Sequence, residues 1–154
     1  MGRWFSRARR EEGAALIETA FTLPIMLLVC VGILEFGRAY QTWQVVTNAA
    51  REGARVAVLP AYPDASVEAR VRTYLKNGGL PAAIVDDASK TKVLITATTI
   101  PIDVGGATTA SAARIVVEYP FEFMVLQPVA QLVVNGSTAG QAFTMRMTTI
   151  MRNE

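Results

Sequence analysis

Few side chains in this 154-residue sequence can perform chemistry. The chain has no histidine and one cysteine, Cys30, so it lacks the most common general base and cannot form an internal disulfide or a Cys/His zinc site. Two carboxylate pairs could perform acid–base work, Asp86 with Asp87 and Glu118 with Glu122. The first lies in an expected loop, and the second alternates with apolar residues as solvated strand residues do. We therefore expect no enzyme activity, no cofactor and no metal.

One carboxylate lies inside an apolar run. Residues 14–34 contain Glu18 as their single charged residue, and Pro24 lies six positions further on. An ionised carboxylate near the centre of a membrane helix costs about 2.5–3.5 kcal/mol, and less near the end, so such a residue is usually paired or functional. The alternative is that Glu18 is solvated among the lipid headgroups. Pro24 removes one backbone hydrogen bond and is expected to kink the helix.

The apolar run itself predicts a membrane-spanning helix. At 1.5 Å per residue its 21 residues extend about 30 Å, which is the thickness of one hydrocarbon core. A cleaved secretory signal is disfavoured, because Arg38 lies in the region where its cleavage site would fall. Four arginines and two glutamates precede the run and place the N-terminus in the cytoplasm: Arg3, Arg7, Arg9, Arg10, Glu11 and Glu12. This stretch accounts for the net charge of +2, so we expect no nucleic-acid binding.

The helical pattern continues beyond the membrane. Apolar and small residues recur every three or four positions from Phe36 to Val58, until Pro60 and Pro63 end the pattern, so one helix is expected from about 14 to 59. Tyr40 and Trp43 lie where interfacial aromatic residues are common. A row of small residues allows another element to pack closely against this helix: Ala49, Gly53 and Ala57.

The remaining sequence predicts a small α+β domain. A short helix is expected at 66–77, a loop at 81–90, and strands at 92–102, 114–124 and 142–151. Pro120 indicates a sheet edge or a bulge. Residues 125–140 have apolar positions at helical spacing, Val129, Leu132 and Val133, for which we favour core packing over an exposed apolar contact.

These patterns give a fold class and a division of the chain. We expect a long N-terminal helix packed on an antiparallel sheet of three to four strands, with one short extra helix. The expected parts are a cytoplasmic N-terminal segment (1–13), the transmembrane half of the helix (14–35), its extramembrane half (36–59) and an extracytoplasmic α+β domain (60–154).

Several short segments together resemble one protein family. An arginine-rich leader ends in Glu11-Glu12-Gly13 and continues as Ala14-Ala15-Leu16-Ile17-Glu18, the layout of a prepilin. The stretches 34–39 (LEFGRA) and 48–55 (NAAREGAR) look like the TadE-like family of pseudopilins, components of the bacterial tight-adherence (Tad/Flp) pilus machinery. The resemblance is strong over residues 13–59 and looser to the C-terminus. Thr19 departs from the major Flp pilins, in which an aromatic residue usually follows the glutamate.

The resemblance implies a role and a set of partners. A prepilin peptidase would cleave after Gly13, and the mature chain would begin at Ala14. The protein would be a minor pseudopilin of the inner membrane that helps to initiate or cap a type IV-like pilus, with other Tad pseudopilins, the major Flp pilin, the assembly platform and the lipid bilayer as partners. Glu18 would pair with the new N-terminal amine of a neighbouring subunit. The alternative is a membrane-anchored scaffold or adhesin that never polymerises, including a TadF-like subunit.

Overall fold

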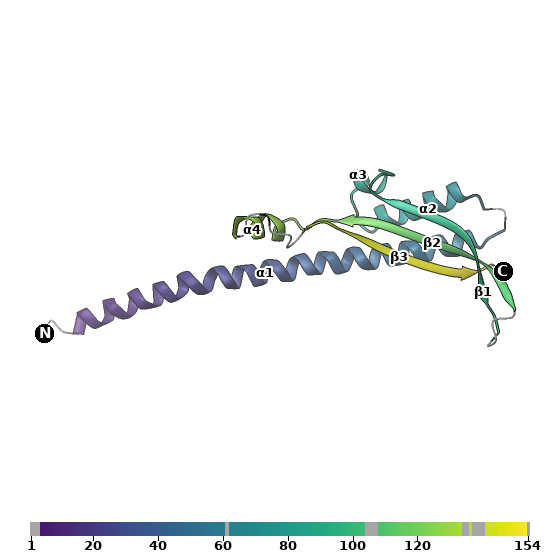
Figure 1. Cartoon of the computed structure of the whole chain (residues 1–154). Helices are drawn as coiled ribbons and strands as arrows, with labels where there is room; N and C mark the ends of the chain where they lie inside the picture. Colours follow the sequence, from purple (N-terminus) through teal and green to yellow (C-terminus); the bar gives the residue numbers. More distant parts are fainter. Residues whose placement is uncertain (1–3, 61, 104–107, 134–135, 137–140, 154) are drawn as a thin grey trace. The chain divides into compact units, whose positions relative to one another are not determined.

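The computed structural model describes residues 4–60, 62–103, 108–133, 136 and 141–153, with the backbone alone at 4–12, 130 and 132–133. The described elements are α1 (Trp4–Ala57), α2 (Asp64–Asn77), α3 (Ala82–Val85), β1 (Lys92–Pro101), β2 (Thr109–Phe121), α4 (Leu126–Val133) and β3 (Phe143–Arg152) (Figure 1). Two compact units result: Met1–Gly37 with Met124–Ala139, and Arg38–Phe123 with Gly140–Glu154. The long helix α1 contributes to both units, and the expected α+β class with a long N-terminal helix is confirmed.

The long helix differs from the prediction at both ends. It begins at Trp4 rather than near Ala14, because the Arg- and Glu-rich leader consists of good helix formers and contains no proline. It ends at Ala57 rather than Leu59, where the Leu59 N–H donates to the Val56 carbonyl oxygen, three residues back, at 3.1 Å. This tight turn precedes Pro60, which has no N–H with which to continue the helix.

The second helix follows its sequence signals. It begins after Pro63, carries Asp64 in its first turn, and buries Val67, Val71 and Leu75 along one face. It ends as predicted at the glycine pair, with Gly79 at a φ of 87°. The segment 81–90, expected to be a loop, contains the short helix α3, so that prediction was incomplete.

The sheet belongs to the second unit and has the order β1-β2-β3, with both pairs antiparallel. The central strand β2 begins at Thr109, five residues earlier than expected, because Thr109–Ala113 pair with Ala97–Pro101 of β1. It ends at Phe121, so Glu122 and Phe123 lie beyond it. Pairing with β1 stops at Glu118, whereas Pro120 still opposes Thr144 of β3. Pro120 therefore lies where β2 has lost its neighbour on one side, consistent with the predicted edge position.

The core lies between one face of the sheet and the helices α1 and α2. Its fully buried side chains include Val46 of α1, Leu75 of α2 and Ile115 of β2. The buried row of α1 also includes Thr42, Ala49 and Ala54. The aromatic residues at the start of the predicted stripe are not part of this row, since Phe36, Tyr40 and Trp43 are 63%, 66% and 46% exposed. The buried row is offset from those aromatic residues, because pairing with the sheet and α2 decides which face of the helix is covered.

The segment 125–140 also departs from the prediction. It contains the helix α4, and neither Val125, which is 42% exposed, nor the half-buried Val129 belongs to the core. The predicted positions Leu132 and Val133 have side chains outside the described residues. The preference for core packing was wrong for the part of this segment that the structure describes, because these residues group with the apolar half of α1 instead of with the sheet.

Candidate functional site

The predicted cleavage and pairing residues lie in the first unit, on α1. Gly13 is half-buried, and a Cβ built on it would meet no atom within 4 Å. Ala14 and Glu18 are exposed. The three residues therefore lie on the helix with their side-chain positions uncrowded at Gly13 and exposed at Ala14 and Glu18.

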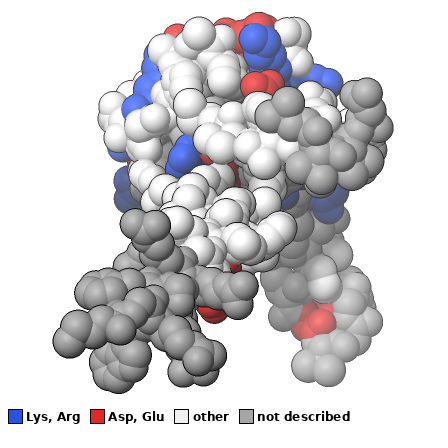
Figure 2. All heavy atoms as spheres, turned by 90° about the vertical axis from the view of Figure 1, so that its left-hand side faces the viewer, with Lys and Arg blue, Asp and Glu red and all other residues white. Residues whose placement is uncertain are grey.

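The apolar run is uncovered along its length. Every residue from 14 to 30 is exposed, and the large side chains Phe21 and Leu34 are 73% and 71% exposed. Among the described residues one helix, Gly13–Ala57, is long and apolar enough to cross a membrane, and none of its most apolar window is buried. Figure 2, which views the molecule from the left-hand side of Figure 1, shows a described surface dominated by uncharged residues. A core helix would be mostly covered, so this exposure indicates a membrane anchor.

Polar groups within the run are partly satisfied by the helix itself. The Thr19 hydroxyl donates to the Ala15 carbonyl oxygen at 2.8 Å, and the Thr22 hydroxyl donates to the Glu18 carbonyl oxygen at 2.9 Å. Such internal bonds let threonine lie in an apolar environment at low cost. Pro24 lies inside α1 and has no N–H, so the carbonyl oxygen of Ala20 lacks its usual helical donor.

A second carboxylate, Glu35, lies where the apolar run ends. Its side chain is only 4% exposed. Its oxygens accept hydrogen bonds from the backbone N–H groups of Met124 and Val125, each at 3.2 Å. Those two residues immediately precede α4, so Glu35 ties the start of that helix to α1 across 89 positions of sequence. This role of Glu35 was not predicted from the sequence, although an acidic residue directly after an apolar run was a visible signal.

Aromatic residues cluster in the second unit beside Arg38. Phe121 lies 5.2 Å from Phe123 and 5.5 Å from Phe143, measured between ring centroids. The guanidinium carbon of Arg38 lies 5.5 Å from the ring centroid of Phe121. Arg38 also affects Tyr119: burial and the negative charge of Glu122 raise the pKa of Tyr119, and the positive charge of Arg38 opposes this increase. Arg38 is the first basic residue after the apolar run, so this cluster marks the start of the polar part of the chain.

The comparison with protein families links the apolar helix to one family. Residues 13–55 match the family model described as TadE-like protein. This part of the chain is similar to TadE-like proteins. The resemblance expected from the sequence is thereby confirmed over these residues, and the match begins at Gly13. No curated protein and no solved structure has a significant match to the chain.

Two residues of the small-residue row, Ala49 and Gly53, lie within the TadE-like segment, and Ala57 lies two residues beyond it. Ala49 is fully buried, Gly53 is buried and Ala57 is half-buried. A Cβ built on Gly53 would lie 2.5 Å from Cγ2 of Val71 on α2 and 3.4 Å from Cγ2 of Ile115 on β2. Gly53 is therefore the point at which the TadE-like helix approaches both of its neighbours in the second unit.

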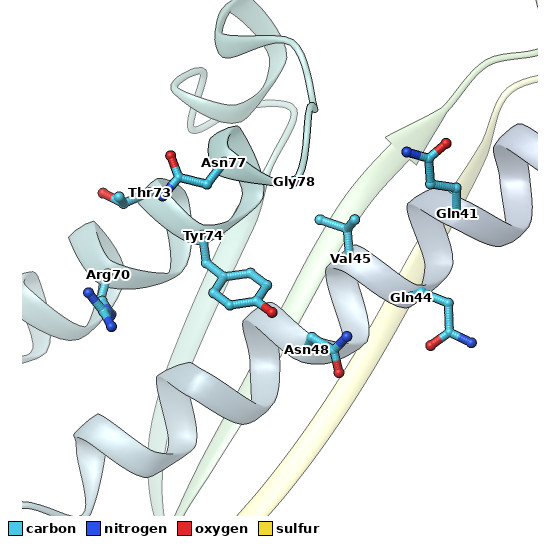
Figure 3. A pocket seen from close by; sticks show the side chains of 9 residues that line it. All are labelled: Gln41, Gln44, Val45, Asn48, Arg70, Thr73, Tyr74, Asn77 and Gly78. Atoms are coloured by element: carbon cyan, nitrogen blue, oxygen red, sulfur yellow. The ribbon is translucent and has the colours of Figure 1, made fainter.

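A groove of about 520 Å³ lies between α1 and α2, and Figure 3 shows Tyr74 reaching across it from α2 toward α1. At the α2 end Arg70 donates to the Glu52 carboxylate at 2.9 Å. This hydrogen bond lowers the pKa of Glu52, opposed by partial burial and assisted by Arg55. The groove is lined mainly by amide, hydroxyl and aromatic groups: Gln41, Gln44, Val45, Asn48, Arg70, Thr73, Tyr74, Asn77 and Gly78. It offers hydrogen bonds but no nucleophile with an adjacent base.

The two carboxylate pairs considered for catalysis have structural partners. Asp86 pairs with Lys76 at 3.1 Å, and Glu118 pairs with Arg146 of β3 at 3.4 Å. Asp87 accepts two hydrogen bonds from Ser89, which lower its pKa. Within the described ranges no group of three or more His, Cys, Asp or Glu residues is placed to hold a metal ion.

Proposed function

We propose that this chain is a minor pseudopilin that takes part in the initiation or capping of a Tad/Flp pilus. The observation that carries the proposal is the TadE-like match over 13–55, which begins at Gly13 and covers an exposed apolar helix. In this proposal a prepilin peptidase cleaves between Gly13 and Ala14 on the cytoplasmic side. The arginines before Gly13 support that orientation.

The proposed partners follow from this role. The mature helix, residues 14–35, spans the inner membrane and packs beside other Tad pseudopilins and the major Flp pilin during assembly on the inner-membrane platform. The sheet domain stays outside the cytoplasm. The role is structural and requires no catalysis by this chain.

The intact mass of the protein extracted from membranes tests the proposal. We expect residues 1–13 to be lost only when the prepilin peptidase is present. A full-length mass under both conditions would contradict processing and favour an unpolymerised scaffold or adhesin, including a TadF-like subunit. Cleavage near residue 39 would instead identify a secreted protein.

Glu18 has a proposed role in assembly. After cleavage the new amine of Ala14 lies four residues from Glu18, about 6 Å along the helix axis. We propose that Glu18 pairs with this amine on a neighbouring subunit, where its exposed position on α1 lets the two helices meet.

Replacing Glu18 with alanine should therefore block incorporation of the subunit. Removing one partner of a desolvated ion pair costs about 3–5 kcal/mol, and each 1.4 kcal/mol is tenfold, so at least about a tenfold loss of the subunit from sheared pili is expected. Thr19→Ala is the matched control, since Thr19 is the exposed neighbour on the same helix and carries no charge. Unchanged incorporation of a correctly processed Glu18→Ala subunit would show that the pairing does not occur.

A further inference from the structure

The longest uncharged stretch of the sequence lies outside the anchor. Residues 123–145 contain no Asp, Glu, Lys or Arg over 23 positions, longer than the uncharged part of the apolar run at 19–34. The helix α4 lies inside this stretch, with the sequence LQPVAQLV. An isolated eight-residue helix is unstable in water, so α4 needs a surface on which to lie.

The structure fixes the start of this helix beside the end of the apolar run. The Glu35 carboxylate accepts hydrogen bonds from the backbone N–H groups of Met124 and Val125 at 3.2 Å. Glu35 is also the first charged residue after the uncharged part of the run. If the run from Ala14 spans the hydrocarbon core, Glu35 lies at its outer boundary, about 30 Å along the helix. The start of α4 is therefore at the level where the acyl chains meet the headgroups.

The two residues that Glu35 binds have exposed apolar side chains. Met124 is 69% exposed and Val125 is 42% exposed, although both are large and apolar. Ile33 and Leu34, which directly precede Glu35, are 67% and 71% exposed. Exposed apolar side chains of the anchor and of the segment that leads into α4 thus lie on either side of the Glu35 hydrogen bonds, within the same compact unit.

We propose that residues 124–133 are a second membrane-contacting element that lies in the interfacial layer of the extracytoplasmic leaflet. Met124 and Val125 insert among the upper acyl chains, and the glutamines of α4 remain at headgroup level. Glu35 satisfies two backbone N–H groups that would otherwise enter this layer without a partner, which lowers the cost of placing irregular backbone there. The proposal rests on the membrane anchoring in the proposed function and adds a lipid contact outside the TadE-like segment.

The occupant is lipid because the hydrogen bonds to Glu35 hold these exposed apolar residues at the end of the anchor, and because residues 123–145 carry no charge. A second copy of the chain is the competing occupant, and it would exclude lipid as well as water from Met124. The two are distinguished by measuring which small molecules reach that position.

The experiment uses the full chain reconstituted singly into nanodiscs of phosphatidylethanolamine and phosphatidylglycerol. The native thiol is removed by Cys30→Ser, and a nitroxide is attached at Met124→Cys. Collisions with oxygen, which concentrates in acyl chains, are compared with collisions with a water-soluble nickel chelate. Leu28→Cys in the anchor and Thr73→Cys on α2 are the lipid and water references, since both positions are exposed.

We expect the oxygen-to-nickel ratio at position 124 to lie close to that of Leu28→Cys and severalfold above that of Thr73→Cys. Adding Glu35→Gln, which removes the charge and one strong acceptor, should move the ratio at 124 toward the water reference while Leu28→Cys stays unchanged. A nickel-dominated signal at 124 with an oxygen-dominated signal at 28 would overturn this inference and leave the anchor intact. Low collision with both reagents at 124 would also overturn it, in favour of a second protein copy. A nickel-dominated signal at position 28 would refute the anchor itself.

Discussion

Replacing Gly53 with alanine is expected to lower the free energy of unfolding of the sheet domain by about 1–2 kcal/mol. Its added methyl group would lie 2.5 Å from Cγ2 of the fully buried Val71, closer than real side-chain contacts allow. Overpacking of this kind costs about 1–3 kcal/mol. A contact as short as 2.5 Å places the cost in the upper part of this range, and alanine regains up to about 1 kcal/mol through its higher helix propensity, which leaves the net loss of about 1–2 kcal/mol.

Chemical denaturation of the full chain in detergent micelles measures this effect. Gly37→Ala is the matched control, because it lies on the same helix and a Cβ built there meets no atom within 4 Å. That variant should be neutral or slightly stabilising. A Gly53→Ala protein as stable as Gly37→Ala would mean that α1 and α2 do not pack this closely. If the clash is the cause, Val71→Ala combined with Gly53→Ala should cost less than the sum of the two single changes.

Replacing Gly13 with leucine is expected to slow cleavage by the proposed peptidase at least about tenfold. Even one extra methylene group in a tight pocket changes the free energy of substrate recognition by about 1–3 kcal/mol. The proposed peptidase must pass the chain backbone through a narrow site, and glycine adds no side chain there. The fold itself has room at this position, where a Cβ would meet no atom within 4 Å. A loss of cleavage would therefore report on the peptidase and not on unfolding.

Time courses of cleavage in membranes, followed by intact mass, provide the measurement. Gly32→Leu is the control, because Gly32 lies on the same helix with equal room around it. It should be processed at the normal rate. If Gly13→Leu were cleaved as fast as the unchanged protein, the scissile bond would not follow Gly13.

The predicted elements were most accurate where the signal is local and periodic. The strand over 143–152 alternates apolar and polar residues, and the second helix begins after a proline and ends at a glycine pair, so both appear nearly at their predicted bounds. The start of β2 was missed because four of its first five residues, Ala110 to Ala113, are small residues with weak strand propensity that become a strand through pairing with β1. The preference for core packing of 125–140 was wrong for its described residues, since apolar residues at helical spacing fit a core and an exposed apolar contact equally well.

The amino-acid sequence by itself determined the anchor and the family resemblance. Both depend on contiguous residues: an apolar run long enough for a bilayer, arginines on one side of it, and the short stretches that surround Gly13 and Gly53. Only the tertiary structure decided which face of the long helix is buried, that Gly53 meets Val71 and Ile115, and that Glu35 holds the start of α4. Those contacts join residues far apart in the chain, and no local pattern specifies which distant surface a helix face or a carboxylate will meet.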